Sequence, residues 1–300
     1  MNKRLVNSCI IKGLNLPGKI NRDQELYAYL LRNSVAYFFS TNLNIPKTIT
    51  DHRIIHQGHK LKKRYLKTIR FLNHLSKESG IPYLLFKTVK RFPEVVDGDI
   101  DLFIKGKDFL RMIKLLCDLG FKCILEEPQK AICSKSGFCR LEPRVEACFH
   151  GLTVIDEKGV WRNQEKLDFA GLTLQTVKQE VDVSYQLLGL LYGPNYLKLY
   201  HFIQCKSVGI DNLLKLYSNP RVKNSLETVW NTLIVNEGSN EASYPIFLPD
   251  RIFLKLWVEN ILPELNINFV EKIRISAFFF YAKYSYLVLG RLHFQHHWYV

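Results

Sequence analysis

The feature that most constrains the fold is the run Gly98–Ile104, which reads Gly-Asp-Ile-Asp-Leu-Phe-Ile. Its apolar residues favour a strand, and in a strand the side chains at positions i and i+2 lie on the same face. Asp99 and Asp101 are therefore expected side by side. Ile100 and Leu102 then lie on the opposite face, where they require a hydrophobic core. The run predicts a sheet strand with one apolar face and one face that carries two carboxylates.

Two carboxylates fixed next to each other repel unless a cation lies between them. Hard oxygen ligands of this kind suit Mg²⁺ or Mn²⁺. A divalent ion held in this way neutralises charge that develops on phosphate oxygens during phosphoryl or nucleotidyl transfer. The pair formed by Asp99 and Asp101 therefore predicts a metal site that serves phosphate chemistry.

The composition predicts a globular chain with a strongly basic start. Its 300 residues suffice for one large domain or two modest ones, and 47% of them are hydrophobic and 13% aromatic. Residues 1–80 hold 15 Lys and Arg against 4 Asp and Glu, a net +11 of the total +14. This excess favours an anionic partner, which is a nucleotide, a nucleic acid or an anionic membrane surface.

The chain has no sequence sign of secretion or membrane insertion. No apolar segment follows the basic residues Met1–Arg4, so no signal peptide is expected. The most apolar stretch, Ala277–Leu289, is too short to span a bilayer and contains Lys283, so we expect a core helix there. These features predict a protein without a membrane span, located in the cytoplasm.

The cysteines point in the same direction. Seven are present, an odd number, and none has C-x-x-C spacing. Neither a disulfide framework nor a zinc site is favoured, which fits a reducing compartment. Cys133 and Cys139 have positions from which they could face each other across a hairpin, but buried free thiols are the preferred interpretation.

Hydrophobic periodicity predicts an α+β fold, in which a small mixed β-sheet flanked by helices is followed by a helical domain. Before the Asp-x-Asp strand we expect helices at 25–39 and 54–78, the second ended by Gly80, and a strand at 82–86. After it we expect a helix at 107–119, strands at 121–125, 131–135, 138–141 and 145–149, and helices from about residue 184. The predicted domains are a basic N-terminal helical segment (1–53), a sheet domain (54–181) and a helical domain (182–300).

This order of elements resembles the nucleotidyltransferase fold of the DNA polymerase beta superfamily. The resemblance rests on Gly98–Leu102 as the [DE]-h-[DE]-h element and on Val145-Glu146-Ala147 as the later h-[DE]-h element. More narrowly, the chain looks like the uncharacterised nucleotidyltransferase-like proteins of prokaryotes, through Phe86-Lys87-Thr88, the Asp-Ile-Asp strand, and Glu146 with His150. The core resemblance covers about residues 60–180.

The resemblance implies a site for an NTP substrate and for Mg²⁺ or Mn²⁺. Asp99, Asp101 and Glu146 are the implied catalytic and metal-binding acids, with Glu146 helping to deprotonate an acceptor hydroxyl. The Gly-Gly or Gly-Ser turn of the family is absent, and Lys87-Thr88 stands in its place. Lys87 and Thr88 are the expected phosphate contacts, and the nearby loop residues that we also expect there are Lys90 and Arg91.

Several residues keep a second interpretation. Lys87 also suits a structural salt bridge to Asp99 or Asp101. Glu142 competes with Glu146 as the third acid, but a bend is expected at the neighbouring Pro143. We expect Arg140 and Arg144 to be solvated. His150 suits either acceptor binding or a purely structural role, and the histidines at 52, 56 and 59 lack the nearby acid or cysteine that a metal site needs.

The leading hypothesis is a metal-dependent nucleotidyltransferase that moves an NMP from an NTP to a hydroxyl of an acceptor. A small molecule, a protein and an RNA all remain open as acceptors. One alternative is a catalytically silent module on the same fold that binds a nucleotide or a partner. The other is an RNA-associated protein that uses the basic N-terminal quarter, where Lys60, Lys63, Arg64 and Lys67 form a stripe.

Overall fold

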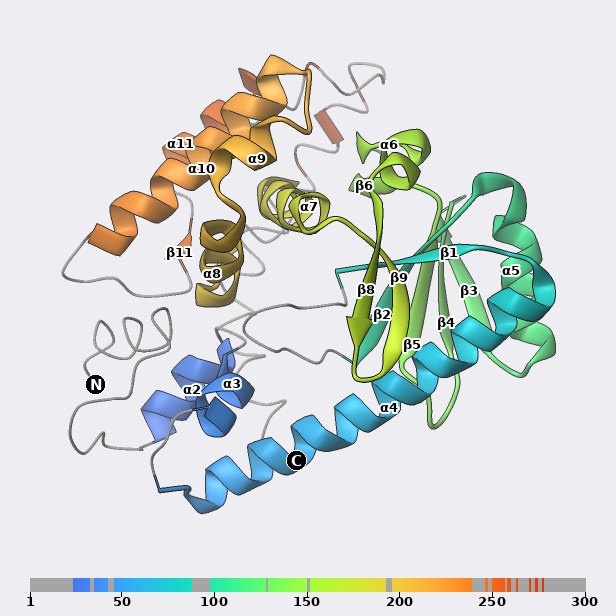
Figure 1. Ribbon diagram of the computed structural model, residues 1–300. Helices are drawn as coiled ribbons and strands as arrows, with labels where there is room; N and C mark the ends of the chain where they lie inside the picture. The colour runs from blue at the N-terminus through green and yellow to red at the C-terminus, as the bar shows by residue number, and fades with distance from the viewer. Residues whose placement is uncertain are drawn as a thin grey trace. The chain divides into compact units, whose positions relative to one another are not determined.

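Figure 1 shows a computed structural model of the chain. It describes residues 24–32, 35–42, 46–87, 98–127, 129–149, 152–192, 196–238, 246–247 and 250–256, with a few isolated positions up to residue 277.

Backbone contacts divide the chain into two compact units. The sheet unit comprises residues 37–148 and 153–182, and the helical unit comprises residues 1–36, 149–152 and 183–300. The three-part division expected at residues 53 and 181 stays a prediction.

The longest element of the sheet unit is the helix α4, Ile49–Ser79. A capping box starts it: Oγ1 of Thr48 accepts a hydrogen bond from the Asp51 amide at 3.1 Å, and Oδ2 of Asp51 accepts one from the Thr48 amide at 2.8 Å. Gly80 ends it in the left-handed conformation, φ 70°, as expected. The helix begins five residues before the expected 54, because its first turn is set by the cap and not by apolar periodicity.

Seven strands form one mixed sheet in the order β3-β4-β5-β2-β1-β9-β8. Strand β2 is antiparallel to β1 and parallel to β5, and β1 is parallel to β9. The strands are β1 (Tyr83–Phe86), β2 (Asp99–Ile104), β3 (Lys122–Glu127), β4 (Lys130–Ser134), β5 (Arg140–Arg144), β8 (Gln164–Phe169) and β9 (Leu172–Val177). This mixed sheet with its helices confirms the predicted α+β class.

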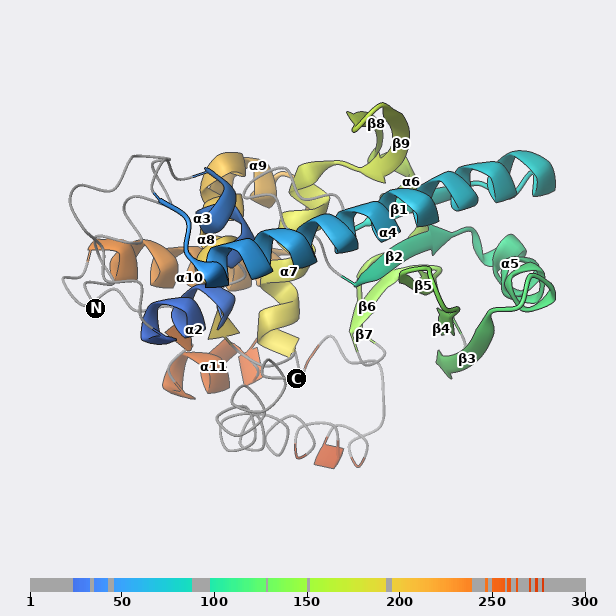
Figure 2. The ribbon, with the colours of Figure 1, turned by 90° about the horizontal axis from the view of Figure 1, so that it is seen from below.

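One face of the sheet builds the core with α4 and with α5, Gly106–Asp118 (Figures 1 and 2). Ile100, Leu102 and Ile104 of β2 are fully buried there, as the alternation predicted. Burying each such side chain contributes about 1.5–3 kcal/mol. The helices supply Tyr65, Ile69, Leu72, Phe109, Met112 and Leu116. The same alternation leaves Asp99 and Asp101 on the opposite face.

The hairpin of β8 and β9 was not predicted. Its turn residues Ala170 and Gly171 both have positive φ, 50° and 75°, which matches the right-handed twist of a hairpin. Strand β9 joins the sheet through Leu85 and Thr176, and the Thr176 hydroxyl donates to the Leu85 carbonyl at 3.0 Å.

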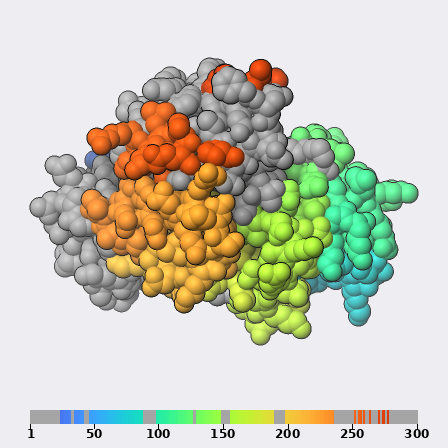
Figure 3. Space-filling view, turned by 90° about the horizontal axis from the view of Figure 1, so that it is seen from above, coloured from blue at the N-terminus to red at the C-terminus, as the bar shows by residue number. Residues whose placement is uncertain are grey.

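In Figure 3 the surface coloured from teal to yellow-green belongs to the sheet unit.

Two sequence expectations about the elements were wrong. The single helix expected at 25–39 is two short helices, α2 (Gln24–Arg32) and α3 (Ala36–Asn42), separated where the Val35 amide donates to the Leu30 carbonyl. The strand expected at 145–149 is reduced to β6, Ala147–Phe149, which pairs with β7, Leu152–Ile155, outside the main sheet.

The bend expected at Pro143 is also wrong. Pro143 lies inside β5, buried and aligned with Leu102 of β2. A proline is tolerated in a strand where its missing N–H is not required by a neighbouring strand. Because the pairing of β5 with β2 continues through this residue, Glu142 lies within the main sheet.

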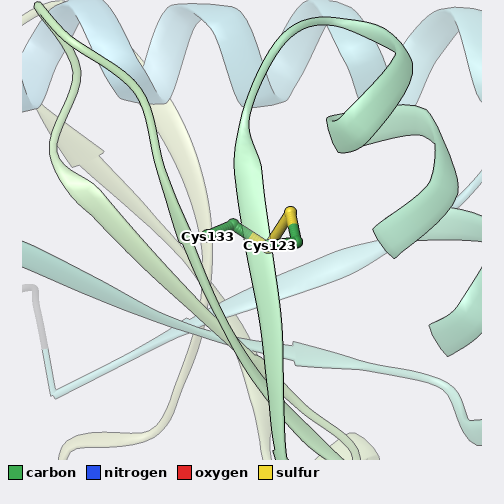
Figure 4. The surroundings of a disulfide bond; sticks show 2 residues. All are labelled: Cys123 and Cys133. Atoms are coloured by element: carbon green, nitrogen blue, oxygen red, sulfur yellow. A yellow bond between two sulfur atoms is a disulfide. The ribbon is translucent and has the colours of Figure 1, made fainter.

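The cysteine expectation was wrong in one respect. Cys123 and Cys133 face each other directly across β3 and β4 and form a disulfide (Figure 4). Cys139, the other residue considered for pairing with Cys133, is a buried free thiol. Cross-strand neighbours in an antiparallel pair are close enough for such a bond.

The helical unit takes up the chain again at residue 183, inside α7, Gln179–Tyr192, whose first residues belong to the sheet unit. Besides α2, its other elements are β10 (Tyr196–Leu197), α8 (Leu199–Val208), α9 (Ile210–Leu214), α10 (Pro220–Gly238), β11 (Ile246–Phe247) and α11 (Asp250–Leu256). The helical character expected after residue 184 is thus confirmed. Among the helices that the structure describes, none combines the length and apolar character needed to cross a membrane. The helix expected at 277–289 lies outside the described residues.

Candidate active site

The Asp-x-Asp run places its carboxylates where three strands of the sheet unit meet. Asp101 is aligned with Phe86, the last residue of β1, and with Glu142 of the parallel neighbour β5. Asp99 is aligned with Arg140 at the start of β5. Aligned residues on paired strands share a face. The face opposite the core therefore carries two aspartates and a glutamate within two adjacent strands.

Six charged side chains on this face are joined in one continuous network of alternating sign. Lys87 Nζ lies 3.1 Å from Asp101 Oδ2, and Arg144 Nη2 lies 2.5 Å from Asp101 Oδ1 and 3.3 Å from Glu142 Oε2. Arg140 Nη2 continues the network to Glu142 at 2.8 Å and to Asp99 at 2.9 Å. Three carboxylates are thus balanced by three cations.

The network runs from a buried end to a solvent end. The side chains of Arg144 and Asp101 are only 5% and 8% exposed, whereas those of Arg140 and Asp99 are 49% and 37% exposed. A buried ion pair loses much of its attraction to desolvation, but removing one partner is strongly unfavourable because a charge is left behind. Arg144 therefore holds Asp101 in place, and the solvent end is the part that a ligand can reach.

The neighbours of Arg140 raise the pKa of its guanidinium. Partial burial acts to lower its pKa, but the charges of Glu142 and Asp99 and the hydrogen bonds to them outweigh burial and raise the pKa. Arg140 is therefore a permanent cation at the solvent end of the network.

Lys87 follows β1 with an uncommon backbone conformation. Its φ is 55°, in the left-handed region that favours glycine. Its amide donates to Oδ1 of the buried Asp182, in the first turn of α7, at 3.0 Å. This is the position where the resembled family has its glycine turn. This chain places there a residue with a left-handed backbone whose ammonium group pairs with Asp101.

The structure separates the two candidates for the third acid. Glu142 is aligned with Asp101 and shares two arginines with the aspartates. Glu146 lies after the end of β5 and before β6, and its side chain is partly buried. The role expected for Glu146 stays a prediction, while Glu142 is the acid that the structure brings to the Asp-x-Asp pair.

The arginines beside the third acid differ from expectation. Both were expected to be solvated. Arg144 is instead buried and ion-paired, and Arg140 is exposed but pairs with both Asp99 and Glu142. Lys87 makes the salt bridge to Asp101 that was its alternative role. Thr88, Lys90, Arg91 and His150 lie outside the described residues, so their expected contacts stay predictions.

In this arrangement the acids that would hold a divalent metal ion are already paired with cations. Carboxylate oxygens suit Mg²⁺ or Mn²⁺, but Asp99, Asp101 and Glu142 each already have a cationic partner. Within the described part of the chain, no three His, Cys, Asp or Glu side chains are grouped so as to hold a metal ion. The histidines of α4 at 52, 56 and 59 are exposed and belong to no such group.

Two functional candidates were missed by sequence reasoning. Asp182 comes from far along the chain, and no local pattern links it to Lys87. Arg144 had a usable signal, because Arg140, Glu142 and Arg144 alternate with Leu141 and Pro143, which is the period of a strand with one charged face. The expected bend at Pro143 hid that alternation.

Comparisons with known proteins add context. No protein family model matches the chain, and no curated protein matches it. Among solved structures, the lincosamide antibiotic adenylyltransferase LnuA with bound lincomycin is 14% identical, with a TM-score of 0.37 over 48% of this chain and 97% of that one. The complex of ANT(2″)-Ia with adenylyl-2″-tobramycin is 14% identical, with a TM-score of 0.40 over 54% of this chain and 95% of that one.

A third similar structure is an antigenic nucleotidyltransferase-like protein from Paracoccidioides brasiliensis. It is 12% identical, with a TM-score of 0.35 over 59% of this chain and 88% of that one. TM-scores below 0.5 are too low to carry the properties of these proteins over to this chain. The α+β assignment therefore rests on the mixed sheet itself, whose central strand bears the two aspartates.

Proposed function

We propose that the protein transfers a nucleotidyl group from an NTP to a hydroxyl of an acceptor and releases pyrophosphate. The observation that carries the proposal is the placement of Asp99, Asp101 and Glu142 on one face of two paired strands, with Lys87 beside them at the end of β1. Phosphoryl and nucleotidyl transfer depend mainly on positioning and charge stabilisation. A rigid face that carries both signs of charge supports such chemistry.

The residues of the network have distinct parts in this proposal. Arg140, half exposed, and Lys87, with 28% of its side chain exposed, are the cations that a triphosphate reaches. Their donors suit phosphate oxygens. A carboxylate, either Asp99 at the solvent end or its neighbour Glu142, then accepts the proton of the acceptor hydroxyl. Arg144 is a positioning residue that fixes Asp101 through their buried ion pair.

Dependence on Mg²⁺ or Mn²⁺, with Asp99, Asp101 and Glu146 as ligands, remains part of the proposal to be tested. The roles expected for Thr88, Lys90, Arg91 and His150 are likewise left to experiment. In the arrangement described above, a metal ion would have to displace Lys87 and Arg140 from the aspartates. No step of the proposed roles of the side chains is routed through the ion.

The charge balance of the network favours a second candidate function. Because three cations already neutralise the three acids, the site is stable without a ligand. A catalytically silent module that binds a nucleotide, or a partner, through Arg140 and Lys87 is consistent with that balance. The two candidates differ in whether the α-phosphate of the nucleotide is ever transferred.

The decisive test uses NTPs labelled at the α-phosphate and a panel of hydroxyl compounds. For the enzyme we expect label to move to an acceptor, and we expect the variant Asp99→Asn/Asp101→Asn to lose this transfer while it remains folded. The matched control Asp118→Asn/Asp168→Asn removes two exposed carboxylates elsewhere in the sheet unit and should transfer normally.

Calorimetric titration of each NTP, with and without Mg²⁺, separates the two candidate functions. Metal-dependent affinity that the Asp99→Asn/Asp101→Asn variant loses supports the enzyme. Binding without any transfer of label supports the silent module. No NTP affinity of the wild type would contradict both the enzyme and a nucleotide-binding module.

A further inference from the structure

The exposed face of α4 carries an unbroken basic stripe. Its members are separated alternately by three and four residues, which is the spacing of one face of an α-helix. Every member is exposed. The stripe consists of Arg53, His56, Lys60, Lys63, Lys67, Arg70, His74 and Lys77.

Very little negative charge offsets this stripe within the helix. The helix contains eight Lys and Arg but only two acids, Asp51 and Glu78. Asp51 is buried in the capping box, and Glu78 pairs with His74 at 3.0 Å at the opposite end. From Arg53 to Lys77 the helix spans about 36 Å at 1.5 Å per residue. This surface suits an extended polyanion, because a small anion needs only a fraction of its length.

Two contacts place α4 beside the start of β2 and the residues before β5, with the acids on the face of the sheet opposite to α4. Arg64 of α4 directs Nη2 towards Gly98, the residue before Asp99: a Cβ atom placed on that glycine would lie 3.6 Å from it. The Nε atom of Arg64 has no hydrogen-bond acceptor among the described residues. Lys67 Nζ lies 4.4 Å from the ring centroid of Phe138, just before Arg140 in the chain. The basic helix therefore passes the ends of β2 and β5 at which Asp99 and Arg140 lie.

We infer that the α4 stripe binds the phosphate backbone of an RNA and that this RNA supplies the acceptor hydroxyl. The inference rests on the proposed function, whose acceptor it names. A membrane surface fits less well, because a membrane-bound helix needs an apolar face for the lipid. The apolar face of α4, with Tyr65, Ile69 and Leu72, is already buried in the core. Rows of Lys and Arg on one helix face are typical of backbone contacts that do not read the base sequence.

The first test measures binding of a fluorescein-labelled oligouridine to the full chain by fluorescence anisotropy at several KCl concentrations. The stripe variant is Lys60→Gln/Lys63→Gln/Lys67→Gln/Arg70→Gln, in which glutamine preserves helix propensity. Each phosphate contact to a single strand contributes about 0.7 to the slope of log K against log salt. We expect the slope to become shallower by up to about 3 and the affinity at moderate salt to fall at least tenfold.

The matched control moves the same charge change off α4. Lys107→Gln/Lys114→Gln/Lys158→Gln/Lys166→Gln neutralises four exposed lysines of the sheet unit and should keep the wild-type slope. Equal losses in both variants, or no RNA binding by the wild type, would overturn the inference. So would binding to phosphatidylserine vesicles that depends on the stripe while the oligouridine does not bind.

The second test distinguishes failure of the inference from failure of the proposed function. Asp101→Asn is expected to bind the oligouridine as the wild type does and to transfer no α-phosphate label to it. Label on small hydroxyl compounds but never on RNA overturns the inference and leaves the transferase standing. RNA binding that depends on the stripe, with no label moved to any acceptor, removes the transferase and with it the acceptor role, but retains the RNA-binding surface.

Discussion

Lys87 and Asp101 form an ion pair, 3.1 Å from Nζ to Oδ2, that joins the end of β1 to the second acid of the Asp-x-Asp run. The same lysine has a left-handed backbone, φ 55°. A side chain with a Cβ atom costs about 1–2 kcal/mol in that conformation, and glycine avoids this cost. The position therefore combines a local backbone cost with a charge contact that offsets it.

Two substitutions separate these effects. Lys87→Ala and Lys87→Gly both remove the ammonium, but only glycine relieves the backbone. We expect the Gly variant to be more stable than the Ala variant by about 1 kcal/mol in urea denaturation, since both lose the same ion pair. Equal urea midpoints for the two variants would mean that residue 87 does not have a left-handed backbone in solution.

We expect the removal of each of the two arginines of the network to lower the free energy of unfolding by a very different amount. Arg144→Met leaves the carboxylates of Asp101 and Glu142 partly unbalanced in a buried place, so we expect a loss of about 3 kcal/mol in the free energy of unfolding. Arg140→Met removes an exposed partner, and the loss should stay below about 1 kcal/mol. Urea denaturation measures both. If the Arg140 variant were the less stable of the two, the assignment of the buried end would be incorrect.

Buried phenols and thiols predict a loss of stability at alkaline pH. Burial raises the pKa of Tyr83 above its usual value of 10.0, and burial also raises the pKa of the Cys139 thiol against the opposing effects of Thr68 and Arg64. In the unfolded chain these groups lose their protons near their ordinary pKa values, whereas the folded chain retains them. The unfolded state then binds fewer protons, so stability falls as pH rises.

Tyr83→Phe isolates one of these groups. Tyr83 donates a hydrogen bond to Asn73 at 2.6 Å, so the variant should lose about 1 kcal/mol at neutral pH. Above pH 10 the wild type should lose stability faster than the variant, by up to about 1.4 kcal/mol per pH unit. The difference between the two proteins is measured by urea denaturation from pH 7 to about pH 11. A difference that does not change with pH would show that Tyr83 titrates normally in the fold.

The parts of the fold that the sequence predicted are those with a regular local pattern. The strand at 99–104 and the helix at 107–119 were placed within one residue, because alternation and a 3.6-residue period are properties of neighbouring residues. The start of α4 depends on a capping box, and the pairing of β9 with β1 depends on a strand far along the chain. A single sequence shows the first weakly and does not show the second.

The candidate site was predictable to a similar extent. Asp99 and Asp101 share a face because they belong to one strand, and that much follows from residue spacing. The register that aligns Glu142 with Asp101 is set by the packing of β5 against β2 and β4, which no residue of β5 specifies alone. The contact between Lys87 and Asp182 joins residues 95 positions apart, so it depends on the completed fold.

The disulfide between Cys123 and Cys133 closes the hairpin of β3 and β4, with ten residues of sequence separation. A cross-link of this length stabilises mainly by restricting the unfolded chain, and the expected contribution is about 2–3 kcal/mol. We therefore expect Cys123→Ala/Cys133→Ala, or wild type with excess dithiothreitol, to lose about that amount in urea denaturation. Cys117→Ala, which removes an exposed free thiol, serves as the control and should keep the wild-type midpoint.

Because β3 is an edge strand of the sheet, the loss of stability should first appear as faster amide exchange in β3 and β4, while β1 and β2 stay protected. Equal exchange in all four strands after reduction would mean that the hairpin unfolds only together with the whole sheet unit.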